Sequence, residues 1–246
     1  MPVNFDPGVT EGHLLGGRVS YAQPRRGFRS GLEPVLLAAA VPARPGDRVL
    51  EGGTGAGAGL LCLAARVAGI TGVGIERVPA MAALAERNLA ANGLTGLAIV
   101  IADLTTAALS GPFDHVFANP PWHDPGSTGS PEGLRRSAMQ ATPGLLPAWV
   151  GALAAPLRPR GTLTLMLPPA HLPEAFDAVR RAACAPAALF PFWPRQGRPA
   201  KLILFHAIKG GRGRCIVHSG LVLHDRADAF TAEAEAILRG AQALRL

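Results

Sequence analysis

The sequence is poor in cysteine and has no long apolar run, and both features limit what the protein can be. Its three cysteines, Cys62, Cys184 and Cys215, lie far apart and form neither a CxxC pair nor a Cys/His ligand pattern. We therefore expect no metal site, and the sparse, odd cysteine count is typical of a cytoplasmic protein. The longest apolar run, residues 60–70, contains Arg66 and is shorter than the roughly 20 residues of a membrane span. The N-terminal residues are acidic and rich in turns, unlike a signal peptide, so we expect no membrane partner.

Lysine is almost absent, although the chain is basic. Lys201 and Lys209 are the two lysines among 24 basic residues, and the formal net charge is +7. The planar guanidinium group of arginine matches the geometry of phosphate, and an excess of positive charge favours a polyanionic partner. A genome preference for arginine codons would explain the choice of arginine over lysine, but it would not explain the net charge. The composition therefore favours RNA as a partner.

The pattern of apolar runs predicts one α/β core with additions at both ends. From about Arg48, short apolar runs alternate with helical stretches rich in Ala and Leu, as in a parallel sheet with crossover helices. Strands are expected at 48–51, 71–76, 97–102, 113–118, 161–167, 188–193 and 201–208. Helices are expected near 57–68, 79–91, 146–155 and 171–184. The tight segment 194–200 predicts that the last two strands form a hairpin at the sheet edge.

The chain divides into three parts on this pattern. Residues 1–44 are an N-terminal addition on the substrate side, with a hairpin and loop over 14–29 and a helix over 34–41. Residues 45–209 form the core, and residues 210–246 are a C-terminal addition whose last helix Thr231 can cap.

A glycine-rich turn follows the first strand of the core at residues 51–57 (EGGTGAG). Glycines let the backbone turn sharply and approach a ligand closely, so Gly53 and Gly55 are the expected cofactor contacts. Gly57 is expected to let the next helix pack against the strand. Glu51 is placed to hold the ammonium group of a methionine moiety.

Two further acidic residues follow the next strands of the core. Glu76 ends the second strand, 21 residues after Gly55, where its carboxylate can accept hydrogen bonds from both ribose hydroxyls of a nucleotide cofactor. These residues fit NAD as well as S-adenosylmethionine, because the glycine spacing also matches the dinucleotide fingerprint. Asp103, after the third strand, can accept from an adenine amino group or cap a short helix.

The fourth strand ends in Asn119-Pro120-Pro121-Trp122, at the edge where open α/β sheets place their chemistry. The prolines fix the backbone and carry no N–H, so the Asn119 side-chain oxygen and the Pro120 carbonyl can both accept from one NH2 group. This turns the nitrogen lone pair toward a methyl donor, and Trp122 offers a face for a planar acceptor. A dehydrogenase has no use for this element. The motif therefore favours S-adenosylmethionine as the cofactor, with these four residues as the catalytic group and Asn119 also beside the cofactor.

The chain resembles the bacterial tRNA(Val) adenine-N6 methyltransferase family, within the small-domain amino methyltransferases whose pattern is [DNS]-Pro-Pro-[Tyr/Phe/Trp]. The similar segments are 14–18, 27–41 (GFRSGLEPVLLAAAV), 51–57, 113–122 (FDHVFANPPW), 135–140 and 193–198. The resemblance implies an α/β, Rossmann-like class I methyltransferase with a seven-stranded, mostly parallel sheet and an antiparallel last strand. It also implies transfer to adenine N6 in tRNA, beside the anticodon. Two departures are Trp122, where the family has Tyr, and Gly52, where it has an apolar residue.

Basic residues in segments that resemble the family's substrate loops are expected to border the acceptor cleft. These candidate RNA-binding residues are Arg25, Arg26, Arg29, Arg135, Arg136, Arg195 and Arg198. The alternative is that they are solvated surface charges.

Three other functions stay open on the sequence. The same four-residue motif serves methylation of a glutamine amide in a protein and of guanine N2 in ribosomal RNA. A non-enzymatic RNA-binding protein on a methyltransferase fold is the third possibility.

Overall fold

The computed structural model describes residues 8–26, 29–122 and 144–246. The helices are α1 (Glu33–Ala40), α2 (Ala58–Arg66), α3 (Pro79–Ala91), α5 (Leu145–Ala154), α6 (Leu172–Arg181) and α7 (Ala232–Leu238). The strands are β1 (Val9–Leu14), β2 (Val19–Pro24), β3 (Arg48–Gly52), β4 (Thr71–Glu76), β5 (Leu97–Ile101), β6 (Phe113–Ala118), β7 (Leu157–Leu167), β8 (Cys184–Arg195), β9 (Leu202–Lys209), β10 (Ile216–Val217) and β11 (Leu221–His224).

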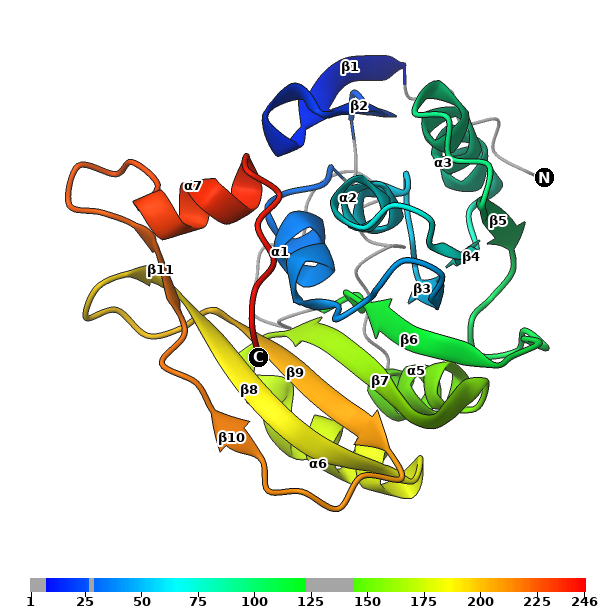
Figure 1. Cartoon of the computed structure of the whole chain (residues 1–246), viewed down its shortest axis with the longest axis vertical. Coiled ribbons are helices and arrows are strands. Elements are labelled where there is room, and N and C mark those ends of the chain that lie inside the picture. Colours follow the sequence, from blue (N-terminus) through cyan, green and yellow to red (C-terminus); the bar gives the residue numbers. More distant parts are fainter. Residues whose placement is uncertain (1–7, 27–28, 123–143) are drawn as a thin grey trace.

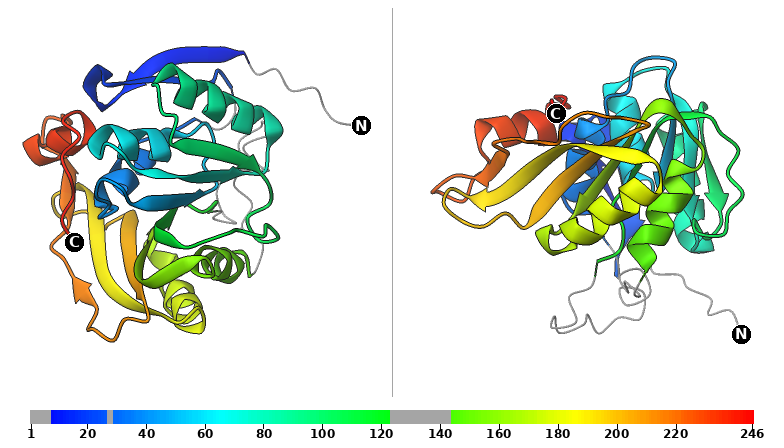
Figure 2. Two further views of the ribbon diagram at one scale, coloured as in Figure 1. Left: turned by 45° about the vertical axis from the view of Figure 1, so that its right-hand side comes forward. Right: turned by 90° about the horizontal axis from the view of Figure 1, so that it is seen from below.

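One large sheet runs through the molecule and carries helices on both faces (Figures 1 and 2). Its strand order is β10-β8-β9-β7-β6-β3-β4-β5, and β11 also pairs with β8. The core on one face is built with α1, α2, α3 and α7, and the core on the other face with α5 and α6. No helix of the described ranges is long and apolar enough to cross a membrane.

The sheet confirms the expected class I arrangement. All seven expected strands are present as β3 to β9, and β9 pairs antiparallel with both β7 and β8, while β3, β4, β5, β6 and β7 pair in parallel. The sheet is larger than the seven strands expected, because β10 and β11 pair in parallel with the outer side of β8. The β8–β9 hairpin is therefore not at the edge. Strands of two and four residues are too short to show a sequence period.

The N-terminal hairpin is tied to the core by Asn88 of α3 and by Asn92 just after this helix, which exchanges hydrogen bonds with the Ser20 backbone. It begins at Val9, earlier than expected, because its turn lies at Gly16-Gly17. The buried Asn88 side chain accepts from the Ala22 N–H at 2.9 Å and donates to the carbonyls of Ala22 and Ala56, at 2.8 and 2.9 Å. Asn88 therefore joins β2, α3 and the glycine-rich turn in one hydrogen-bonded unit.

The helix ends follow the sequence signals. α3 spans the expected residues 79–91, with Pro79 in its first turn, and Gly93 follows in the left-handed conformation at φ 66°. The Thr231 hydroxyl accepts from the Ala234 N–H at 3.2 Å, which confirms the expected cap of α7. The expected C-terminal addition thus contributes two strands to the sheet and one helix that contacts α1.

Candidate active site

The glycine-rich turn and the Asn-Pro-Pro-Trp motif emerge at the same level of the sheet. β3 and β6 are parallel neighbours, and Gly52 at the end of β3 is the register partner of Ala118 at the end of β6. On the other side of β3, Gly52 is aligned with Ile75, one residue before Glu76. The topology therefore brings three of the sequence-predicted segments to the carboxyl edge of three adjacent strands.

Left-handed glycines shape the turn after β3. Gly53, Gly55 and Gly57 have φ angles of 66°, 57° and 88°, a region that side chains with a Cβ rarely enter. A Cβ on Gly53 would lie 2.6 Å from Cη2 of Trp149 in α5. Gly57 lies against Ala85 of α3, where a Cβ would sit 3.4 Å from the Ala85 Cβ. The turn is therefore packed from both sides.

Gly52 tightens the packing around the turn. A Cβ at this position would approach Leu104 Cδ2 to 2.8 Å and Leu153 Cδ2 to 3.2 Å. These two leucines use the space that the apolar residue of the resembled family would need. The departure from that family is thus matched by its surroundings.

Glu51 is a buried carboxyl at the base of the turn. Its Oε2 accepts from the Leu60 N–H at 3.1 Å and from the Thr54 hydroxyl. Burial raises the pKa of Glu51 to about 7, against the opposing effect of these two hydrogen bonds, and the charge of Glu76 raises it further. An ammonium group beside Glu51 would favour the ionised form.

Glu76 uses both carboxylate oxygens to hold backbone N–H groups. Oε2 accepts from Gly55 at 2.9 Å and Oε1 from Val78 at 2.8 Å. An ionised carboxylate has further lone pairs, so it can also accept from ligand hydroxyls. The side chain thereby positions the glycine-rich turn relative to the start of α3.

Asp103 follows β5 and is exposed. Its Oδ1 accepts from the Thr105 N–H at 2.9 Å and from the Thr105 hydroxyl at 2.6 Å, and a turn rather than a helix follows. These hydrogen bonds, with a smaller contribution from the charge of Arg77, lower the pKa of Asp103. Asp103 therefore caps a turn and not the short helix that was expected, and its role toward adenine stays a prediction.

The Asn119–Trp122 segment leaves β6 with its aromatic ring held in place. Trp122 Nε1 donates to the Met166 carbonyl at 3.1 Å. The His171 ring lies 4.3 Å from the indole, centroid to centroid, at an angle of 36°. Pro120 is buried, whereas Asn119 and Trp122 are partly exposed. The indole is therefore fixed before any acceptor arrives.

Several residues at this edge have no sequence motif that marks them. Trp149 lies against the glycine-rich turn, and His171 lies against Trp122 in the short helix η2 (Pro169–His171). The buried Tyr21 hydroxyl is 2.6 Å from Ser30 Oγ; burial, with a smaller contribution from the charge of Glu51, raises the Tyr21 pKa to about 12. Of these three residues, only His171 carries a signal that sequence reasoning could have used, because it follows shortly after β7, at the carboxyl end of a strand.

The candidate RNA-binding arginines lie in separate parts of the molecule. Arg25 and Arg26 are exposed after β2, and Arg29 donates to Thr10 Oγ1 at 3.0 Å and to the Pro24 carbonyl at 3.2 Å. Arg195 pairs with Asp228 at the end of β8, and Arg198 is exposed in the following turn. Arg135 and Arg136 lie outside the described residues.

Among the residues that are described, no cluster of three or more His, Cys, Asp or Glu side chains could hold a metal ion.

Comparisons with known proteins agree with this geometry. Residues 34–136 match the family described as "Methyltransferase small domain". A release factor glutamine methyltransferase from Rhodospirillum rubrum is 42% identical over 77 residues, which are 31% of this chain and 24% of that protein. The chain thus spans about a quarter of that relative.

Two solved structures share the fold. A predicted O-methyltransferase from Agrobacterium tumefaciens is 26% identical, with 87% of this chain and 98% of that chain covered and a TM-score of 0.72. The geranyl diphosphate C-methyltransferase from Streptomyces coelicolor A3(2), solved with S-adenosyl-L-homocysteine, is 12% identical, covers 72% and 75% of the two chains, and has a TM-score of 0.54. The chain therefore has the fold of S-adenosylmethionine-dependent methyltransferases, and its residues 34–136 are similar to the methyltransferase small domain family.

Proposed function

We propose that the protein transfers a methyl group from S-adenosylmethionine to an NH2 group on a planar acceptor, most favourably adenine N6 in tRNA. The observation that carries the proposal is the register of Gly52 with Ala118, which puts the glycine-rich turn beside Asn119-Pro120. Donor and acceptor elements thus meet at one edge of the sheet.

The residues present fit the methyl donor. Glu51 is buried and has no ion pair within the described residues, so it suits an ammonium group that the ligand brings. Glu76, at the end of the neighbouring strand, would accept hydrogen bonds from ribose hydroxyls, and the left-handed glycines allow a close backbone approach. When bound, the cofactor supplies a sulfonium methyl group, a strong electrophile.

The chain's own contribution is to orient the acceptor nitrogen. The Asn119 side-chain oxygen and the Pro120 carbonyl accept hydrogen bonds from its two N–H groups, so the lone pair is directed at the methyl carbon. The new C–N bond forms as the S–C bond breaks, and the nitrogen then loses one proton to solvent. Positioning and the two acceptor oxygens stabilise the charge that grows on this nitrogen.

Adenine is favoured over a bare amide by Trp122. An indole fixed by Met166 and His171 can stack a base, and stacking contributes about 1–3 kcal/mol. The exposed arginines that follow β2 and β8 suit the phosphates of a folded RNA. The tRNA and its anticodon loop come from the family resemblance, and a loop base is accessible without opening a duplex. A cytoplasmic location is part of the same proposal.

A glutamine amide is the second candidate, because the release factor glutamine methyltransferase is the relative with 42% identity over its matched segment. Its side-chain NH2 group can use the same two acceptor oxygens. That match leaves most of the relative's length uncovered, so its substrate is not transferred to this chain.

One experiment separates these acceptors. The purified protein is incubated with methyl-labelled cofactor and either total tRNA, ribosomal RNA or a release factor, and the products are digested and identified by mass spectrometry. We expect N6-methyladenine in tRNA, and labelling about 100-fold slower or less with Asn119→Ala. Label only in protein, or only as N2-methylguanine, would overturn the adenine assignment while leaving a methyltransferase.

A further inference from the structure

We propose that the amino edge of the sheet, opposite the catalytic edge, is a second contact surface for RNA phosphates. The parallel strands β3, β6, β7 and β8 begin at this edge and the antiparallel β9 ends there, so segments distant in sequence converge. We call the basic residues of these segments the amino-edge arginines: Arg44, Arg48, Arg158, Arg160, Arg180, Arg181, Arg212 and Arg214. The inference rests on the proposed function in taking RNA as the partner.

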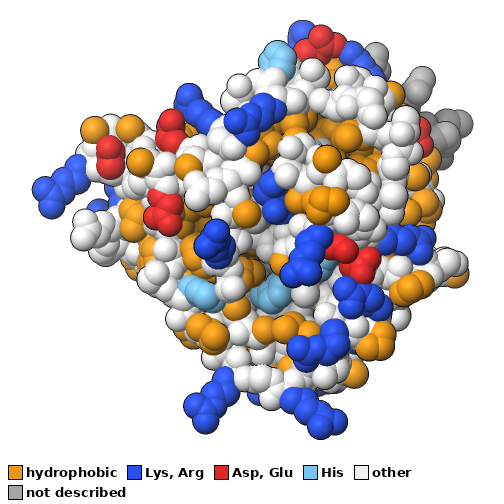
Figure 3. Space-filling model, in the orientation of Figure 1, with side chains coloured by type: hydrophobic (Ala, Val, Ile, Leu, Met, Phe, Trp, Pro, Cys, Tyr) orange, Lys and Arg blue, Asp and Glu red, His pale blue; other side chains and the backbone are white. Residues whose placement is uncertain are grey.

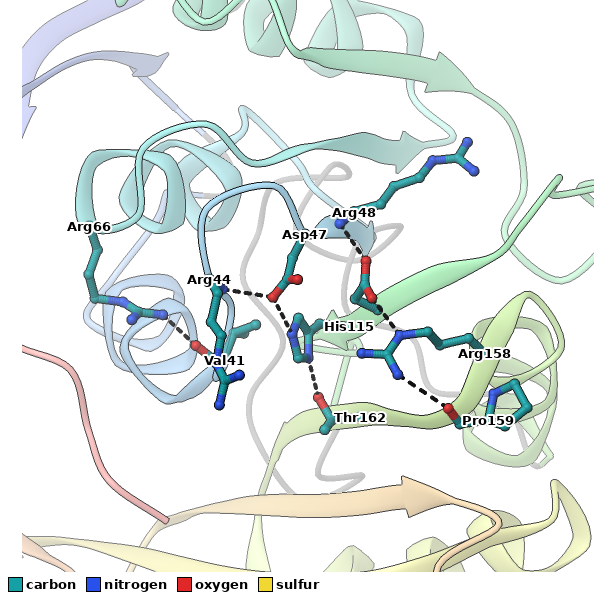
Figure 4. Close-up of polar contacts among 10 residues, drawn as sticks. Val41, Arg44, Asp47, Arg48, Arg66, His115, Arg158, Pro159 and Thr162 are labelled. Carbon is teal, nitrogen blue, oxygen red and sulfur yellow. Dashed lines mark hydrogen bonds and ion pairs between the residues drawn. The ribbon is translucent and has the colours of Figure 1, made fainter.

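The acidic residues Asp47 and Asp114 of these segments hold backbone N–H groups, and among the amino-edge arginines Arg158 forms an ion pair with Asp114 (Figure 4). Asp114 accepts from the Arg48 N–H at 2.7 Å and from Arg158 Nε. Asp47 accepts from the Arg44 N–H at 2.7 Å and contacts His115 Nε2 at 3.0 Å. These contacts fix the start of β3 against β6 and β7.

Six of the amino-edge arginines keep their charges available to solvent. Arg44, Arg160, Arg180, Arg181, Arg212 and Arg214 are exposed, and none has an ion pair within the part of the chain that the structure describes. Other exposed arginines do pair: Arg87 with Glu11, Arg195 with Asp228 and Arg239 with Glu235. Figure 3 shows many blue side chains and few red ones over the region where β7, β8 and β9 lie in Figure 1. Unpaired like charges at this density favour a polyanion.

A bulge in β7 adds to the surface at some cost in backbone strain. Between Phe113 and His115 of β6, the register on β7 moves from Leu157 to Thr162, so the residues between them loop out of the sheet. Arg160 there has a φ of 65°, which is unfavourable for a residue with a side chain. At the bulge Arg158, Pro159 and Arg160 are all exposed, whereas a regular strand would turn alternate side chains into the core. Strain of this kind is more common at functional sites than elsewhere.

The dimensions suit an RNA backbone. The five adjacent strands β3, β6, β7, β9 and β8, in their order across the sheet, span about 19 Å at the usual strand spacing. The six residues of β6 separate the two edges by roughly 20 Å. A folded RNA with its reactive base at the catalytic edge can therefore place a stem against the amino edge. Arginine forks bind phosphates there without reading sequence.

The test compares two triple variants that lose the same charge. Arg181→Gln, Arg212→Gln and Arg214→Gln remove three amino-edge charges, while Arg87→Gln, Arg226→Gln and Arg239→Gln remove three exposed charges elsewhere. Binding of fluorescently labelled total tRNA is measured by anisotropy from 50 to 300 mM salt. We expect the amino-edge variant to bind tRNA about tenfold more weakly near 0.15 M salt. The slope of the logarithm of its association constant against the logarithm of the salt concentration should be smaller in magnitude by about 3. The affinity of the control variant should change less than about threefold.

Equal losses in both variants, or full affinity in the amino-edge variant, would overturn the proposal. So would binding of the wild-type protein to phosphatidylserine vesicles but not to tRNA. The catalytic proposal is tested separately by the methylation of total tRNA with the wild-type protein and labelled cofactor. If no N6-methyladenine forms in tRNA but the tRNA affinities of the two variants separate as expected, the proposed function fails and this surface stands.

Discussion

The Glu76 carboxylate at the end of β4 accepts a hydrogen bond from the Gly55 N–H at 2.9 Å, so the second strand holds the turn that follows the first. Its other oxygen accepts from Val78 at the start of α3, at 2.8 Å. A single side chain thus sets both the shape of the glycine-rich turn and the position of a carboxylate beside it.

Glu76→Gln should weaken S-adenosylmethionine binding by roughly 1.5–3 kcal/mol, because a ribose hydroxyl bonds more strongly to a charged acceptor than to an amide. Titration calorimetry measures this loss, with Glu86→Gln, an exposed residue of α3, as the matched control. Unchanged affinity in Glu76→Gln, or a preference of the wild-type protein for NAD, would contradict this role.

Asn119→Ala should leave cofactor affinity nearly unchanged and reduce turnover about 100-fold or more, as removal of one positioned polar group does in other enzymes. Single-turnover rates and calorimetry on the same preparation separate the two quantities. A parallel loss of binding and activity would show that Asn119 is structural.

Cofactor affinity should rise with pH across the pKa of Glu51. Burial raises this pKa to about 7, and the ammonium group of the cofactor pairs only with the ionised form. Below pH 7 the dissociation constant should therefore increase by up to about tenfold per pH unit. Calorimetry from pH 5.5 to about 6.7 stays a full unit below the usual α-amino pKa of about 7.7–8.0, so the ligand keeps about nine tenths of its charge or more. In Glu51→Gln this dependence should disappear, and a dependence that persists would assign it to another group.

Gly53→Ala should destabilise the fold more than Gly46→Ala. Both glycines have left-handed φ angles, 66° and 91°, but only Gly53 faces a ring, with a Cβ position 2.6 Å from Trp149 Cη2, whereas Gly46 faces open space. We expect a loss of about 1–2 kcal/mol in the free energy of unfolding at Gly46 and about 2–5 kcal/mol at Gly53. Equal losses in urea unfolding would mean that Trp149 moves aside freely.

Stability should fall in acid because His206 is buried as a neutral ring. Burial lowers its pKa to about 4, with a smaller contribution from His115, and Thr164 Oγ1 lies 3.0 Å from its Nδ1. The unfolded chain takes up this proton near pH 6.5, so the stabilisation is complete above pH 6.5 and is lost toward pH 4, by up to about 3 kcal/mol. Burial also lowers the pKa of His115, which adds loss in the same direction. In denaturant unfolding, the free energy of unfolding of His206→Gln should depend less on pH over this range than that of the wild type. The pH dependence of the exposed His13→Gln should match the wild type.

The sequence by itself determined the positions of the core elements and of the two motifs. Apolar periodicity and turn residues act locally, so the strands β3 to β9 and the helix from Pro79 to Ala91 follow from neighbouring residues. The parallel α/β pattern then requires that residues 51–57 and 119–122 emerge at the same edge. Both motifs were therefore identifiable without coordinates.

Only the tertiary structure decided what surrounds those motifs. Three contacts around the motifs join residues that lie from 32 to 96 positions apart, and no local period encodes them. Trp149 packs against Gly53, His171 packs against Trp122, and Asn88 links β2 to the glycine-rich turn. The pairing of β10 and β11 with β8 is likewise a nonlocal choice, made by short segments against an open strand edge. The amino-edge arginines come from separate loops, and they form one surface only because parallel strands must all begin on the same side of a sheet.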